Sequence, residues 1–465
     1  MHEINHSRSF PFLGLSLSVV GRPFFIFHRR LSVVGFLFFI VWCRLSVVRF
    51  SFFILLCCLL IAPPVAALAE APTSAPISFN TNFDGGSLGK IECLSDTHFR
   101  CAVRGEYNYQ GRNRQASWYY FRMDNVRGRD ITIELTDLVG EYDNRPGAIA
   151  IKKTTRPVFS SDGKTWQHFE SMDYDDKEAK AILHFRLTHD RIWIAHIQPY
   201  TSRDLQSLLD SVRGSPDLRI ETIGKTAQGR DLLLLTVTNF ARPDTNKKVV
   251  WLVARQHAWE SGGSFVAEGA IRLILSGDPE ARRLRDRVIF KFIPMADPDG
   301  VARGGVRFNA NGYDVNRHWE EVDLRDPKSL AAMPEIWYMK KAIVDFARSE
   351  RPIDLLLYLH NEEDNDWISG APVSDPAFQK LVERFYDLLM AETTFDGRQR
   401  PSNRPDSLSG TSLALYQAAK VPAVLMEQKV TMNKRLGRLP TAADRVEFGK
   451  ALIRCMARAV LNAER

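Results

Sequence analysis

Residues 249–260 read Val-Val-Trp-Leu-Val-Ala-Arg-Gln-His-Ala-Trp-Glu and join an apolar run to two side chains that can bind metal. The first six residues are continuously apolar, which is typical of a strand covered on both faces in a parallel sheet. His257 and Glu260 follow where the strand turns into a helix. Because ligands bind beyond the carboxyl ends of strands in open α/β sheets, this stretch predicts a site at that edge.

Residues 201–465 repeat this alternation of apolar strands with amphipathic helices. Further strands are expected at Leu232–Val237, Val288–Met295, Leu355–Leu359 and Val421–Met426. Helices are expected at Gly263–Leu275, Leu330–Ser349, Asp375–Thr393 and Ala443–Asn462. The pattern predicts an α/β domain with a mixed, mostly parallel central sheet.

Three of the other expected strands also lead to polar residues. One run leads to Asp297 and Asp299, another ends directly at His360, and the last ends directly at Glu427. The carboxyl ends of parallel strands meet at one edge, so residues spread over the whole domain are expected to converge there. This convergence is more specific than any one of the short motifs.

Neutral imidazole and carboxylate are suitable ligands for zinc, and a catalytic zinc site needs three protein ligands and an open position. The pair His257 and Glu260 also fits an exposed histidine and a glutamate favoured by the helix dipole. His360 alone fits a structural histidine. Glu427 fits either a solvated carboxylate or a half-buried base with a raised pKa.

Residues 76–200 have a different character, with many short strand-like runs separated by turn residues. The clearest runs are Trp118–Phe121, Ile131–Leu135, Ala148–Lys152, Thr165–Phe169, Ala181–Leu187 and Ile192–Ile197. Such a series predicts an antiparallel β-sandwich domain ahead of the α/β domain.

Several stretches, taken in order, resemble the zinc carboxypeptidase A-type family. They are Arg255–Glu260, Pro294–Gly300, Arg307, Tyr313–Arg317, Leu359-His360, Gly410-Thr411 and Met426-Glu427. The chain is most similar to the cytosolic-carboxypeptidase-like branch, in which a β-sandwich precedes the catalytic domain. The resemblance implies one Zn²⁺ per chain, held by His257, Glu260 and His360. It also implies that Asp314 orients the His257 ring.

The same resemblance implies roles for four more residues. Arg307 would polarise the scissile carbonyl and stabilise the oxyanion. Asn316 and Arg317 would clamp the terminal carboxylate of the substrate, although the pair alone also fits a solvated turn. Glu427 would act as the general base toward the attacking water and then pass the proton to the leaving amine.

The sequence departs from the family pattern at three places. Ala258 and Trp259 replace the usual Pro-Gly between the first two ligands, and the bulky Trp259 is expected to narrow the cleft. The usual tyrosine ahead of the base is absent, and Pro405 falls at its position. Ser412 follows Gly410-Thr411 where deglutamylating members carry a basic residue, which weighs against polyglutamate as the substrate.

These patterns predict a zinc-dependent metallocarboxypeptidase that removes C-terminal residues from peptides or proteins. Two alternatives remain open at this point: a cell-wall peptide amidase with the same zinc chemistry, and a non-catalytic peptide-binding protein. A nucleic-acid partner is not expected. Of the formal charge of +7, residues 1–69 carry +5, so the rest of the chain is nearly neutral.

Residues 1–69 are interpreted as a leader, with Phe50–Ala62 as the apolar segment and Ala67-Leu-Ala69 as the cleavage motif. The rival interpretation is an uncleaved anchor helix. A cleaved leader predicts an exported protein, periplasmic or extracellular, with no stable insertion in a membrane. In that oxidising setting Cys93 and Cys101 would form a hairpin disulfide, and the alternative is two half-buried thiols.

Overall fold

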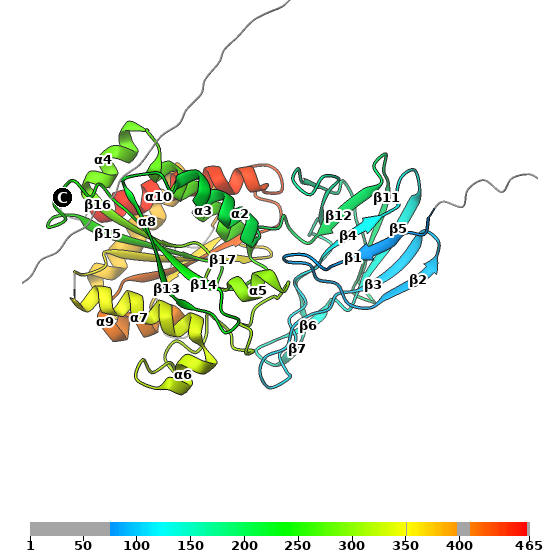
Figure 1. Ribbon diagram of the computed structural model, residues 1–465, viewed down its shortest axis with the longest axis horizontal. Helices are drawn as coiled ribbons and strands as arrows, with labels where there is room; N and C mark the ends of the chain where they lie inside the picture. The colour runs from blue at the N-terminus through cyan, green and yellow to red at the C-terminus, as the bar shows by residue number, and fades with distance from the viewer. Residues whose placement is uncertain (1–74, 350, 398–409, 463–465) are drawn as a thin grey trace, which may run out of the picture. The chain divides into compact units, whose positions relative to one another are not determined.

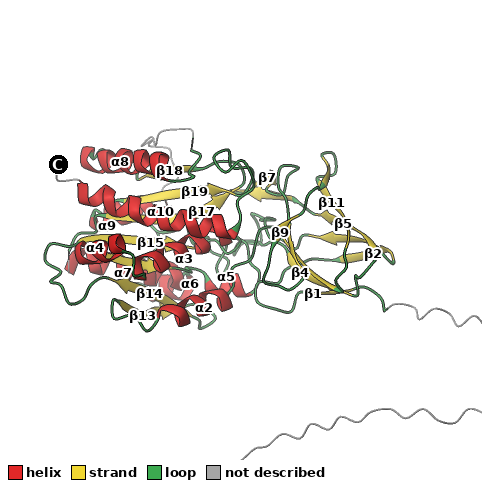
Figure 2. Cartoon of the chain, turned by 90° about the horizontal axis from the view of Figure 1, so that it is seen from above, coloured by secondary structure: helices red, strands yellow, loops and turns green. Residues whose placement is uncertain are grey.

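The computed structural model describes residues 75–349, 351–397 and 410–462, which belong to one compact unit. The predicted leader, with its cleavage motif, and Pro405 lie outside the described residues. None of the helices in these three ranges is both long and apolar enough to cross a membrane. Figure 2 shows the described helices gathered in one part of the molecule, beside a part that consists of strands and loops. In the order of the chain, the strand-rich part comes first.

The sandwich domain consists of two five-stranded sheets and a separate hairpin. The first sheet has the order β1 (Ser78–Asn80), β4 (Tyr120–Asp124), β12 (Arg191–Ala195), β8 (Val158–Ser160) and β9 (Gln167–His168). The second has the order β10 (Asp173–Asp175), β11 (Lys180–Arg186), β5 (Asp130–Thr136), β3 (His98–Ala102) and β2 (Ile91–Ser95). The hairpin is β6 (Val139–Tyr142) and β7 (Arg145–Ile149). The predicted antiparallel sandwich is confirmed, apart from the parallel pair of β3 and β5.

Strict alternation builds the core of the sandwich. Ile131, Ile133 and Leu135 on β5 are buried, as are Ile192 and Ile194 on β12, and all five belong to one apolar cluster. Side chains two apart on a strand point to the same face, so each strand contributes one apolar row to the space between the sheets.

The α/β domain is built on a seven-stranded sheet. Its order is β13 (Leu218–Lys225), β14 (Asp231–Val237), β16 (Val288–Ile293), β15 (Lys248–Ala254), β17 (Leu355–Glu362), β19 (Ala423–Lys429) and β18 (Trp367–Gly370). The four strands β16, β15, β17 and β19 are parallel, whereas the edge strands pair antiparallel. The predicted α/β class with a mixed sheet is therefore confirmed.

Helices cover both faces of this sheet (Figure 1). One face carries α2 (Ser202–Val212), α3 (Ser261–Leu275), α4 (Pro279–Arg287), α8 (Pro376–Glu392) and α10 (Ala442–Leu461). The other face carries α7 (Pro334–Ser349) and α9 (Gly410–Ala419). The short helices α5 (Pro298–Ala302) and α6 (Pro327–Ala332) lie in connections. The two apolar layers fix the positions of the strand ends, where the polar side chains follow.

Two features differ from the sequence-based expectation for physical reasons. The helix expected over Leu330–Ser349 is two helices, α6 and α7, which meet at Pro334. Proline has no backbone N–H to continue the ladder of the preceding helix. The edge strand β13 was missed because most of its side chains are solvent-exposed, so it lacks an apolar run.

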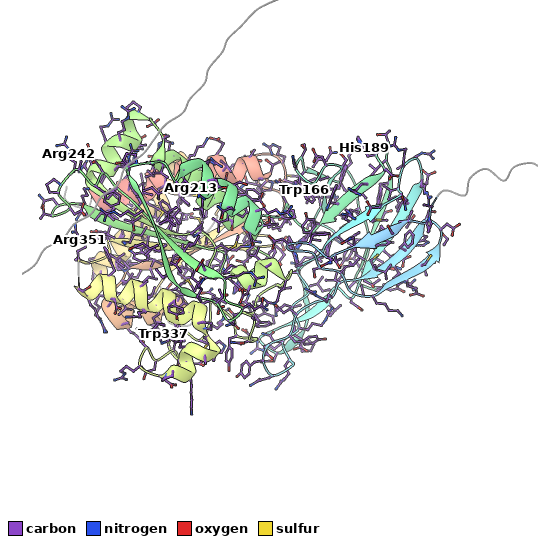
Figure 3. All side chains as sticks on the ribbon, viewed as in Figure 1. Trp166, His189, Arg213, Arg242, Trp337 and Arg351 are labelled. Atoms are coloured by element: carbon purple, nitrogen blue, oxygen red, sulfur yellow. The ribbon has the colours of Figure 1, made fainter. Side chains whose placement is uncertain are left out.

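An aromatic seam joins the sandwich to the α/β domain. Trp259 stacks on His196 with ring centroids 5.5 Å apart, and His196 stacks in turn on Tyr119 at 5.9 Å. Trp166, labelled in Figure 3, packs against the same cluster from the sandwich side. The sandwich strand β12 ends at Ala195 and helix α2 begins at Ser202, so the chain changes character between these residues.

Candidate active site

The candidate site lies at the carboxyl ends of the parallel strands. Strand β15 ends at Ala254, shortly before His257, and Ala254 pairs with Leu359 on β17. His360 follows Leu359 and pairs directly with Glu427 on β19. Parallel register thus brings His257, His360 and Glu427 to one edge of the sheet, as the sequence predicts.

His257, Glu260 and His360 form a buried cluster whose ligand atoms all lie within 4.8 Å of one another. His257 Nδ1 is 2.7 Å from one Glu260 carboxylate oxygen, and His360 Nδ1 is 2.9 Å from the other. The two Nδ1 atoms face each other at 3.1 Å. Two imidazole lone pairs and a carboxylate that converge in this way fit Zn²⁺ as the resident cofactor.

The hydrogen-bond partners of the two Nε2 atoms indicate which ring nitrogens are free to bind a metal. His257 Nε2 lies 3.0 Å from Asp314 Oδ1, and His360 Nε2 lies 3.0 Å from Gln256 Oε1. Both partners are oxygen acceptors, so each Nε2 carries the proton and each Nδ1 keeps its lone pair. Gln256 was not predicted, although it stands between the strand and His257 in the sequence.

Asp314 connects the metal cluster to the side chains that are predicted to bind the substrate. Its Oδ1 also accepts from the backbone N–H of Asn316 at 2.9 Å, and its Oδ2 pairs with Arg307 Nε. Burial alone would raise the pKa of Asp314, but the charge of Arg307, aided by His257, holds it well below its usual value. The carboxylate of Asp314 is thus favoured in its ionised form, in which it can orient His257 and Arg307 together.

The predicted carboxylate clamp is held from behind by helix α9. Thr411 Oγ1 donates to Asn316 Oδ1 at 2.8 Å, which fixes the amide. A Cβ on Gly410 would lie 2.6 Å from the Asn316 carbonyl oxygen, so only glycine permits this approach. Arg317 Nη1 donates to the same carbonyl at 3.1 Å, and its other Nη group reaches the hydroxyl of Tyr142 at 3.3 Å.

The loop that carries Arg307 is held by Glu106, a residue of the sandwich domain. One carboxylate oxygen of Glu106 accepts from three consecutive backbone N–H groups, those of residues 306, 307 and 308. Its other oxygen pairs with Arg303. Burial would lower the pKa of Arg307, but Asp314 raises it further, so the guanidinium stays charged.

These side chains line one cavity of about 270 Å³. From the α/β domain it is lined by His257, Trp259, Glu260, Arg307, Asn316, Arg317, Asn361, Glu362, Glu363, Trp367, Leu425 and Glu427. From the sandwich it is lined by residues 114–117, 138, 140–142 and 148–150. The contribution of the sandwich was not predicted, because it depends on how the two domains pack.

Glu427 reaches this cavity with one oxygen, Oε2, that is buried and has no hydrogen-bond partner. Burial raises the pKa of Glu427 well above its usual value, and the negative charges of Glu260 and Glu362 add to the rise. A raised pKa makes a carboxylate a stronger base, which suits it to accept and return a proton.

Two acidic residues that the sequence places at the same edge are not part of the cavity. Asp297 caps α5 by accepting from the Gly300 N–H at 2.9 Å. Asp299 accepts from Thr226 Oγ1 at 2.9 Å and pairs with Arg230. Both carboxylates therefore stabilise loops through these hydrogen bonds. Trp259, in contrast, lines the cavity and also packs against His196 in the seam.

Two family models match consecutive parts of the chain. Residues 79–196 match the cytosolic carboxypeptidase N-terminal domain, and residues 205–364 match the zinc carboxypeptidase model. The chain carries a zinc carboxypeptidase domain. The match of that domain covers the three clustered ligands, Asp314 and the clamp residues, and it ends before Glu427, whose position rests on the geometry above.

The chain is also similar to individual proteins that carry a zinc carboxypeptidase domain. It is 28% identical to human cytosolic carboxypeptidase 2 over 356 residues, covering 71% of this chain and 38% of that protein. It is 30% identical to mouse cytosolic carboxypeptidase 6 over 270 residues, covering 53% of this chain and 47% of that protein. The chain thus spans less than half the length of these relatives. The predicted resemblance is confirmed at the level of homology.

Solved structures share the fold. The metallo-carboxypeptidase of Burkholderia cenocepacia superposes with a TM-score of 0.72 at 24% identity, covering 83% of this chain and 99% of that one. The metallo-carboxypeptidase of Pseudomonas aeruginosa, in complex with (2-guanidinoethylmercapto)succinic acid, superposes with a TM-score of 0.71 at 22% identity. It covers 83% of this chain and 100% of that one.

The prediction of an exported protein, periplasmic or extracellular, is wrong. The N-terminal domain matches the cytosolic carboxypeptidase type, and the relatives are named cytosolic carboxypeptidases, which contradicts the prediction of export. Cys93 and Cys101 are free thiols, so the predicted alternative of a hairpin disulfide does not form. The register explains this, because Cys93 pairs with Phe99 and Cys101 pairs with Ile91.

Proposed function

We propose that this protein is a zinc-dependent carboxypeptidase that hydrolyses the last peptide bond of peptides or proteins. The observation that carries the proposal is the meeting of four kinds of group in one cavity. These are a zinc-type ligand cluster, a carboxylate with a raised pKa, an arginine beside the cluster, and the pair Asn316 and Arg317.

Each residue would contribute a defined step. When bound by His257, Glu260 and His360, zinc supplies a Lewis acid that polarises a carbonyl and makes water acidic. Glu427 takes the proton from the attacking water and passes it to the amine that leaves. Arg307, held by Asp314 and Glu106, donates hydrogen bonds to the oxygen that becomes negative in the transition state. The water oxygen first adds to the carbonyl carbon, and the peptide C–N bond then breaks as the leaving nitrogen receives the proton from Glu427.

Arg317 and Asn316 supply the selectivity for a free chain end. A guanidinium binds a carboxylate through two parallel hydrogen bonds, and Asn316 adds an amide donor beside it. A blocked C-terminus offers no charge to this pair. The site is therefore suited to an exopeptidase, with peptide or protein C-termini as its substrates.

The alternatives that the sequence left open are not favoured. A cell-wall amidase would require export, and the relatives are carboxypeptidases named as cytosolic. The non-catalytic interpretation rested on Trp259 and on the missing tyrosine. Trp259 packs against His196 in the seam, and the three ligand residues still cluster with this tryptophan present.

The test is a mass-spectrometric assay of the full chain against a panel of peptides that differ in their last residue. Each peptide is supplied as the free acid and as the C-terminal amide, with and without a zinc chelator. We expect loss of single C-terminal residues from the acids only, and none with the chelator. Equal cleavage of acids and amides, or internal cleavage, would contradict the proposal.

A further inference from the structure

The hairpin β6–β7 is an extension of the sandwich domain with a tight two-residue turn. Its turn residues, Asp143 and Asn144, both have positive φ, at 49° and 63°. Two such residues in a two-residue turn match the right-handed twist of the flanking strands. Tyr142 pairs with Arg145 directly across this turn. The tip of the hairpin therefore has a defined conformation.

Glu141, the neighbour of Tyr142, fastens the hairpin to the sandwich. Its side chain accepts from the Asn113 N–H at 2.6 Å, and its backbone N–H donates to the Arg114 carbonyl at 2.7 Å. Its own carbonyl accepts from Gln115 Nε2 at 2.7 Å. Three anchors on one residue fix the position of the side chain that follows it.

Tyr142 points from this anchored hairpin to the cationic end of the active-site cavity. Its hydroxyl lies 3.3 Å from Arg317 Nη2, and its ring centroid lies 5.9 Å from the Arg307 guanidinium carbon. Tyr142 also lines the cavity, and it is 45% exposed. An exposed tyrosine that contacts two buried or half-buried arginines of the cavity is placed for a ligand rather than for packing.

We propose that Tyr142 binds the terminal carboxylate of the substrate together with Arg317, so that the sandwich domain supplies part of the substrate site. The phenol oxygen accepts from Arg317, and its O–H is left to donate to a carboxylate oxygen. The ring adds a cation–π contact that holds Arg307 in place. This inference deepens the proposed function and rests on it.

The chemistry explains why a tyrosine suits this position. Arg317 brings only donors and a positive charge, which a carboxylate needs on one side. A phenol hydroxyl adds a directional donor from the other domain without adding charge. The free acid of the substrate would then contact both domains, whereas a C-terminal amide would lose the charged partner for both groups.

The test uses the full-length, zinc-loaded protein with a Glu427→Gln background for binding and the native base for kinetics. The probes are a fluorescent pentapeptide acid and its C-terminal amide, titrated by anisotropy. Tyr142→Phe removes only the hydroxyl, and Tyr142→Ala removes the ring as well. Tyr107→Phe is the matched control, because Tyr107 is an exposed sandwich tyrosine that does not line the cavity. Thermal melting of each variant checks its fold.

We expect Tyr142→Phe to weaken binding of the acid roughly tenfold, the loss typical of one hydrogen bond to a charged group. Binding of the amide should not change. In kinetics KM should rise by a similar factor with kcat unchanged, since ground state and transition state share this contact. Tyr142→Ala should weaken binding of the acid further, and Tyr107→Phe should leave it unchanged.

The proposal on Tyr142 is overturned if both Tyr142 variants bind the acid as tightly as the parent while Arg317→Ala loses it. Failure of the proposed function would look different. In that case the parent protein would cleave no peptide at all, yet Tyr142→Phe would still weaken binding of the acid, and the binding role of Tyr142 would stand.

Discussion

Asp314 shows how one side chain can set the geometry of a whole site. Its two oxygens contact the His257 ring, the Arg307 guanidinium and the Asn316 backbone. One carboxylate thus contacts the proposed metal ligand, the proposed transition-state donor and the proposed substrate clamp. A shift of this residue would move all three at once, so its loss cannot be compensated at one position.

Replacing Asp314 with Asn is therefore expected to affect two measurements together. Zinc affinity should fall about 10- to 100-fold, the usual cost of removing the acceptor behind a ligating histidine. The loss in kcat/KM measured at saturating zinc should be larger still, because Arg307 also loses its ion pair. Competition with a chromophoric chelator gives the affinity. Asp323→Asn, at an exposed ion pair with Arg325, is the control. Unchanged zinc affinity would contradict the role.

Glu427→Gln should separate metal binding from proton transfer. The substitution keeps the size of the side chain and removes the base, so we expect kcat to fall by at least about 10²-fold. Zinc content, measured by elemental analysis, should stay at one per chain because Glu427 is outside the ligand cluster. Full activity in this variant would rule out Glu427 as the base.

Among the individual residues of the site, those at the ends of strands could be predicted from the sequence. Those that the sandwich domain contributes could not. His257, His360 and Glu427 were found because apolar runs lead straight to them. Glu106 and Tyr142 could not be found, because each meets its partners across more than 170 residues of sequence. No local pattern encodes such a contact, which exists only after the domains have packed.

Among the elements, the loop of residues 303–308 has an unusual support. Its backbone donates three N–H groups to one oxygen of Glu106, and Arg303 pairs with the other oxygen. Glu106 is largely buried, with 13% of its side chain exposed. These backbone N–H groups are satisfied by a side chain of another domain, where a helix or sheet would satisfy them with backbone carbonyls.

Glu106→Ala should leave these N–H groups without their acceptor. Each buried donor left unpaired costs about 1–3 kcal/mol, so a clear drop in melting temperature is expected. The kcat/KM should fall as well, because Arg307 stands on this loop. Glu92→Ala provides the comparison: Glu92 forms an exposed ion pair with Arg100, which contributes little to stability. Equal effects of the two substitutions would argue against a special role for Glu106.

Strands could be predicted from the sequence where both of their faces are buried. Strands β15, β16, β17 and β19 each contain a run of apolar residues because helices cover both faces. The edge strands β13 and β18 have at least one exposed or partly exposed face, which weakens the pattern. The break between α6 and α7 could have been read from Pro334.

For the molecule as a whole, the seam between the domains contains a buried histidine that responds to acid. His196 donates to the Ser117 carbonyl at 2.5 Å, and its other ring nitrogen has no partner. Burial lowers the pKa of His196 to about 4, although the bond with Ser117 opposes the shift. The unfolded chain binds this proton with a pKa of about 6.5.

Stability should therefore fall as the pH drops from about 6.5 toward 4, because only the unfolded state takes up the proton in this window. Near pH 4, the loss of unfolding free energy caused by His196 would reach about 3 kcal/mol. We expect His196→Gln to flatten the dependence of the unfolding free energy on pH in denaturant titrations. His189→Gln, at an exposed histidine labelled in Figure 3, should leave it as steep as in the parent. Parallel curves for parent and His196→Gln would contradict the assignment.

The sandwich domain limits how the domains of this protein could be separated or exchanged. Glu106 supports the loop of Arg307, and Tyr142 and its neighbours form one wall of the cavity. The α/β domain expressed alone would lack that wall and would expose the Trp259 side of the seam. The two domains are thus not interchangeable modules. A chimaera that exchanged the sandwich for that of a relative would inherit a different catalytic pocket, even with every residue after 200 unaltered.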